Sequence, residues 1–96
     1  MLVVTGDIWM AGDVPGELEA EILRLLEERG EGKTICPSEV ARAVVASEER
    51  ALWEPLMGAV RAAALQLVAE GEVAITQRGQ VVDGATAKGP IRLRSR

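Results

Sequence analysis

The 96-residue sequence contains no histidine, no phenylalanine and no tyrosine, and it has one cysteine, Cys36. Histidine is the commonest general base in enzymes and the commonest side-chain ligand of metal ions. No Ser–His or Cys–His nucleophile can therefore be assembled within this chain, and one cysteine without histidine does not make an ordinary zinc site. The single cysteine also excludes a disulfide within the chain. We expect no cofactor, no metal site and no enzymatic activity.

Aromatic side chains are limited to Trp9 and Trp53, so Leu, Val, Ile, Ala and Met must fill the interior. Two isolated indole rings do not form a platform on which bases stack, and we interpret both as packing residues. Charged residues make up 27% of the chain and apolar residues 48%, which is typical of a single globular domain at this length.

The sequence also lacks an apolar stretch long enough to cross a bilayer. The apolar N-terminus has no basic residue ahead of it and is interrupted by Asp7, unlike a signal peptide. We therefore expect a cytoplasmic protein with no membrane partner.

Charge is distributed unevenly along the chain, although the net value is only −4. Residues 1–60 hold twelve acidic and five basic side chains, a net −7, whereas residues 61–96 hold three acidic and six basic ones, a net +3. Such a split can indicate an anionic partner for the basic half. The alternative interpretation is an ordinary solvated surface.

The first 14 residues form an apolar leader with a turn-like Thr5-Gly6-Asp7 in its middle. This pattern indicates an edge strand, a dimer contact or a loosely held tail, and the residues do not decide among them. A first helix is predicted to begin near Pro15, a residue suited to the first helical position, and to end at Gly30. Its apolar stripe recurs with helical spacing at Leu18, Ile22, Leu25 and Leu26.

Signals for two further helices follow a short extended piece at residues 33–35. Pro37 suits the first position of a second helix and Glu39 its third, where the carboxylate can cap the helix, with Cys36 at the cap position. A third helix is predicted over residues 54–70, with Pro55 in its first turn. Its expected buried face comprises Leu56, Val60, Ala63, Ala64, Leu67 and Val68.

The last third of the chain alternates like a β-hairpin. Residues 72–77 predict a strand, Arg78-Gly79-Gln80 a turn, and residues 90–94 a last strand with Ile91 and Leu93 inward. The stretch between them, through Ala87-Lys88-Gly89, is predicted to be a flexible loop. The order helix, strand, helix, helix, hairpin is that of a winged helix-turn-helix. We predict an α+β fold of three helices and a small antiparallel sheet or wing in residues 15–96, preceded by the leader, residues 1–14.

Four sequence blocks, KTICPSEVAR, AVRAAALQLVAEG, ITQRG and GPIRLR, resemble a small bacterial winged-helix family that is catalogued only as a domain of unknown function. The resemblance spans about residues 17–94. It implies the winged-helix fold and a bacterial source, and it implies no activity and no catalytic residue.

A winged helix commonly places its third helix in the major groove of DNA and its wing against the backbone. The expected partner is the backbone of DNA or RNA, because the outward face of the third helix offers few side chains that read bases. The candidate contacts are Arg61 and Gln66 on the third helix, and Arg78, Lys88, Arg92 and Arg94 on the wing.

Two other functions stay open on the sequence. The third helix, with Leu65 at the centre of an exposed Ala/Leu face, and the apolar leader suit a protein–protein adaptor or a homodimer. Cys36, at a helix N-terminus near Lys33, has a setting that favours thiolate, and it is alternatively a small buried capping residue.

Overall fold

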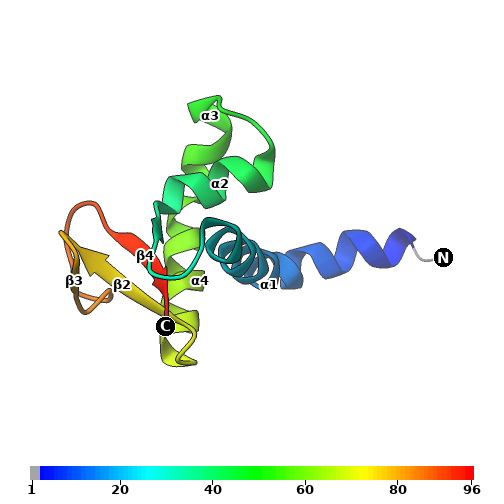
Figure 1. Ribbon diagram of the computed structural model, residues 1–96. Coiled ribbons are helices and arrows are strands. Elements are labelled where there is room, and N and C mark those ends of the chain that lie inside the picture. The colour runs from blue at the N-terminus through cyan, green and yellow to red at the C-terminus, as the bar shows by residue number, and fades with distance from the viewer. Residues whose placement is uncertain (1–2) are drawn as a thin grey trace.

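The computed structural model describes residues 3–96, with side chains from Gly16 onward. The elements in chain order are α1 Val3–Arg29, β1 Thr34–Ile35, α2 Pro37–Val45, α3 Arg50–Trp53, the 3₁₀ helix η1 Glu54–Leu56, α4 Met57–Ala69, β2 Val73–Gln77, β3 Gln80–Val81 and β4 Arg92–Ser95. Helices α1, α2 and α4 pack together with the sheet beside them, and the N-terminal part of α1 extends away from the rest (Figure 1). The result is an α+β fold with the predicted winged-helix layout.

The leader is helical, which contradicts one of its three predicted alternatives, the edge strand. Helix α1 begins at Val3 and runs without a break to Arg29, so Pro15 lies inside the helix rather than at its start. Extending a helix that is already formed adds one hydrogen bond per residue without a second nucleation step. That advantage outweighs the turn propensity of residues 5–7. Residues 1 and 2 lie outside the described residues.

Helix α2 confirms the predicted start and cap. It spans Pro37–Val45, and the Glu39 carboxylate accepts a hydrogen bond from the Cys36 backbone N–H at 3.0 Å. The third predicted helix is also present, but its first turn is the 3₁₀ helix η1, which contains Pro55. The helix then continues as α4. Of the six residues expected on the buried face of the third helix, the four that are buried lie in α4, whereas Leu56 of η1 and Val68 of α4 are half-buried.

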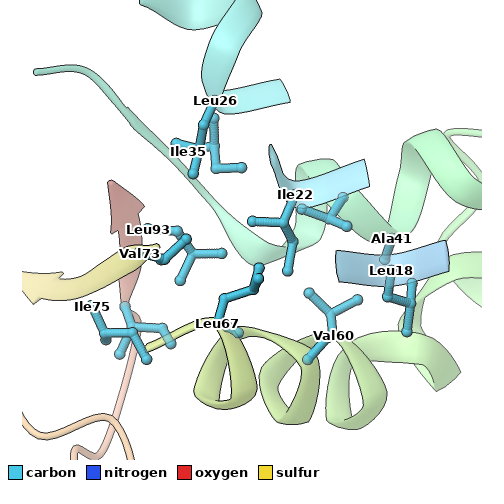
Figure 2. Packing of buried hydrophobic residues seen from close by; sticks show 14 residues of the cluster. Leu18, Ile22, Leu26, Ile35, Ala41, Val60, Leu67, Val73, Ile75 and Leu93 are labelled. Carbon is cyan, nitrogen blue, oxygen red and sulfur yellow. The ribbon is translucent and has the colours of Figure 1, made fainter. Parts of the chain in front are cut away.

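The sheet is antiparallel with the order β1-β4-β2-β3. Ile35 and Ile75 both pair with Leu93, so one row of apolar side chains crosses three strands. In Figure 2 this row lies at one end of the core near Leu26 of α1 and Leu67 of α4, and Leu18 and Val60 lie at the other end beside Ala41. All of these residues belong to one hydrophobic cluster. On the other face of β2, Ala74 and Thr76 are also buried; their neighbours on β4 are Arg94 and Arg92.

A turn joins β2 to β3 where it was predicted, but it comprises only Arg78 and Gly79, because Gln80 pairs with Gln77 as the first residue of β3. Both residues have positive φ, +52° and +81°, which is the type I′ geometry that matches the twist of a hairpin. The return segment, residues 82–91, then leads back to β4. It has no helix or strand, as the predicted loop requires, but part of it is packed: Gly84 is buried against Ile75, and the Asp83 carbonyl accepts from the N–H of Ala87 at 2.9 Å.

Candidate nucleic-acid interface

The basic residues of the two halves of the chain have different surroundings. Each of the five ion pairs within residues 16–96 lies before residue 55, and four arginines make them: Arg24, Arg29, Arg42 and Arg50. Within those same residues, no basic side chain beyond Arg50 has a carboxylate within 4.0 Å. The positive charges of the second half therefore form no salt bridge in this part of the chain, although the charge of Arg92 acts on the Glu39 carboxylate from a greater distance.

Three of these cations line one groove on the wing. The groove, of about 610 Å³, is hereafter the wing groove, and its walls are Gln77, Arg78, Gln80, Val82, Lys88, Pro90 and Arg92. Arg78 comes from the hairpin turn, Lys88 from the return segment and Arg92 from β4, so three separate elements converge. All three side chains are exposed.

Gln77 holds the groove together. Its side-chain Nε2 donates to the carbonyl of Lys88 at 2.7 Å and to that of Pro90 at 3.1 Å. These bonds fix the return segment against the end of β2, and with it the backbone that carries Lys88. Sequence reasoning missed Gln77, because its position beside the turn carries no signal for partners eleven and thirteen residues away.

Arg92 and Arg94 lie two residues apart on β4 and so share the outer face of the sheet. Arg92 Nε donates at 3.0 Å to Oγ1 of Thr34 on the neighbouring strand β1, and this bond orients the Arg92 guanidinium over the sheet. Arg94 pairs in register with Thr34 on one side and Ala74 on the other. The four wing cations of the sequence prediction are therefore brought to one hairpin and the adjoining sheet face.

The two candidates on α4 are not brought together. Arg61 Nη2 donates to the carbonyl of Ala87 at 2.9 Å, so its half-buried side chain ties α4 to the return segment. Gln66 lies five positions further along, about 140° around the helix. It donates to the Glu70 carboxylate at 3.1 Å. Gln66 and Glu70 line a separate hollow between α4 and α1, to which α1 contributes Glu19. Gln66 therefore faces an acidic surface.

Leu65 departs from the exposed position that an adaptor face would need. It is half-buried, and a Cβ built on Gly84 would lie 3.0 Å from its Cδ2. The return segment therefore covers Leu65. Apart from Gln66, the exposed residues of α4 are all small: Gly58, Ala59, Ala62 and Ala69.

Cys36 is half-buried at the start of α2, and its Sγ accepts a hydrogen bond from Ser38 Oγ at 3.2 Å. The Glu39 carboxylate occupies the same helix end and is paired with Arg29. Burial raises the pKa of the Glu39 carboxyl, but the bonds from Cys36 N–H and Arg29, with the charge of Arg92, outweigh it and hold that pKa below 4.5. A carboxylate therefore sits beside the thiol.

Trp53 packs partly against the core, as predicted, and its Nε1 donates to the Glu48 carbonyl at 3.2 Å. Trp9 lies outside the residues with described side chains. Within that part of the chain, no cluster of three or more cysteine or acidic side chains is placed to hold a metal ion. No helix in residues 3–96 is both long and apolar enough to cross a membrane.

The sequence matches the family described as "Protein of unknown function (DUF3253)" over residues 15–96. The chain belongs to this family. The matched region begins inside α1 and contains every other element of the fold, so the family unit includes the wing groove. A comparison with the curated proteins found no match.

Proposed function

We propose that this protein is a regulatory nucleic-acid-binding module that holds the phosphate backbone of a duplex through its wing. The observation that carries the proposal is the gathering of cations that form no salt bridge, within residues 16–96, on the hairpin and the outer sheet face. Cations that are not paired within the protein are free to neutralise phosphates. The overall acidity does not oppose this, because twelve of the fifteen acidic residues precede Arg61.

The proposal favours contact with the backbone over reading of bases. Small residues occupy the exposed face of α4, whereas base edges are read by Arg, Asn, Gln or Lys in the major groove. Gln66 is paired with Glu70, and Arg61 is bonded to the return segment. We therefore expect weak dependence on sequence. A non-catalytic role in the cytoplasm of a bacterium is part of the same proposal.

Salt dependence tests the proposal. If Arg78, Lys88, Arg92 and Arg94 each neutralise one phosphate, the logarithm of the association constant falls with that of salt at a slope of about −3.6. Affinity for a duplex DNA of arbitrary sequence then drops about 100-fold between about 50 and 200 mM salt. Fluorescence anisotropy measures both values, and a duplex RNA of equal length shows which helix geometry the wing prefers.

Two double variants separate the wing from charge in general. Arg78→Ala with Lys88→Ala should halve the slope to about −1.8. Arg24→Ala with Arg50→Ala removes the same charge from exposed arginines that are paired with glutamates, and it should leave the slope unchanged. Absence of binding at low salt, or equal losses in the two variants, contradicts the proposal.

The alternative is a protein–protein adaptor that uses the face of α4 and the leader. Its support is the small-residue surface of α4, although Leu65 is covered. Absence of DNA binding together with a concentration-dependent dimer in light scattering would favour it.

A further inference from the structure

A second concave site adjoins the return segment and shares Pro90 with the wing groove. It is formed where α2 begins, where α4 begins and where the return segment ends, and it holds about 440 Å³. We name it the Arg61 cavity, and the walls used below are Cys36, Pro37, Met57, Gly58, Arg61 and Pro90. Its volume is within the usual range of small-molecule sites.

The walls are apolar except at one point. Pro37, Met57 and Pro90 present hydrocarbon and thioether surface. Gly58 contributes no side chain, and a Cβ built there would meet nothing within 4 Å. Room for an apolar body is therefore built into the junction of the three elements.

The polar point is the guanidinium of Arg61. It is half-buried, and Nη2 donates to the Ala87 carbonyl. Within residues 16–96, Nε and Nη1 have no hydrogen-bond acceptor, and no carboxylate lies within 4.0 Å. Nη2 keeps a second N–H, which together with the N–H of Nε or of Nη1 can donate one pair of parallel hydrogen bonds to a carboxylate in this apolar setting.

We propose that the Arg61 cavity binds a small monocarboxylic acid, with its aliphatic or aromatic body against Pro37, Met57 and Pro90 and its carboxylate on Arg61. The apolar walls exclude a highly charged ligand such as a polyphosphate, and the single cation matches a single negative charge. This proposal does not depend on DNA binding, since Arg61 is not among the four wing cations.

Cys36 provides the readout, because it is the only cysteine of the chain and lies on the cavity wall. The rate at which a thiol-reactive dye labels Cys36 is measured with increasing octanoate. We expect a saturable slowing at millimolar octanoate. Octanol and octylamine, which have the same chain without the carboxylate, should protect at least about tenfold more weakly. Labelling of glutathione under the same conditions controls for effects on the dye.

Two variants locate the binding. Gly58→Leu places a side chain in the cavity and should abolish protection by octanoate. Arg61→Gln keeps a polar amide in the cavity but removes the charge, and it should weaken octanoate at least about tenfold while leaving octanol unchanged. Thermal unfolding checks that each variant is folded.

The wild-type protein alone can overturn the proposal. Absence of saturable protection by octanoate excludes the site, and equal protection by octanol and octanoate excludes recognition of the carboxylate. Loss of octanoate protection on adding duplex DNA, but not on adding an uncharged polymer, would assign Arg61 to phosphate instead and overturn the proposal as well.

Discussion

Replacing Arg78 by asparagine removes one cation from the wing groove and relieves a backbone conformation that arginine seldom adopts. Arg78 has φ +52° in the hairpin turn. The left-handed region costs an ordinary L-residue about 1–2 kcal/mol, and asparagine is among the residues that tolerate it best. We expect Arg78→Asn to raise the free energy of unfolding by about 0.5–1 kcal/mol. For a domain of this size the Tm should rise by about 2–8 °C.

The same substitution should weaken DNA binding. Loss of one phosphate contact lowers the steepness of the salt dependence by about 0.9. Far-UV circular dichroism follows the Tm, and anisotropy titrations follow the binding, on the same preparations. A gain in stability together with a loss of binding would explain why a strained position carries arginine.

Arg78→Ala is the matched control, because it removes the same charge and leaves a residue that tolerates the left-handed region poorly. It should reduce binding as much as Arg78→Asn does without raising the Tm. The reasoning fails if alanine and asparagine change the Tm equally, or if either variant binds DNA as the wild type does.

Gly84→Ala should lower the free energy of unfolding by about 1–3 kcal/mol, because the new Cβ would lie 2.2 Å from Cδ1 of the buried Ile75. Urea unfolding measures this as a lower midpoint. An unchanged midpoint would show that the return segment is not packed there. Folding lowers the pKa of the Glu39 carboxyl below its ordinary value of 4.5. The stability that its charge contributes is therefore fully present above pH 4.5, and it is lost as the pH falls through the pKa of the folded state. The Tm of the wild type should therefore exceed that of Glu39→Gln at neutral pH, and the two should converge in acid; a gap that stays constant with pH would refute this.

Much of the fold follows from local signals in the sequence. Pro37 and Glu39 mark the start of α2 because capping chemistry acts within one turn of helix. Arg78-Gly79 marks the hairpin because a two-residue turn requires positive φ, which glycine supplies at the second position. The alternation of apolar residues also predicts the pairing of Ile75 with Leu93, which the register confirms.

The candidate site was only partly predictable. The wing cations could be identified by charge and by their place near the hairpin. The role of Arg61 could not, because its bond to Ala87 joins residues 26 positions apart and depends on how the return segment packs on α4. The helical leader was missed for a different reason: its own propensities are mixed, and its state depends on the helix that follows it.

The position of β4 has a consequence for how the chain assembles. β1 and β2 do not pair with each other, and each of them pairs with β4. β4 follows β1 late in the chain: the hydrogen bond between Arg92 and Thr34 joins residues 58 positions apart. During synthesis the helices can collapse early through local contacts. The sheet, however, lacks the strand that joins β1 to the β2–β3 hairpin until β4 has been made. A nascent chain stalled before Arg92 would thus expose two strand edges at once, and it is at this stage that the protein is most open to aggregation.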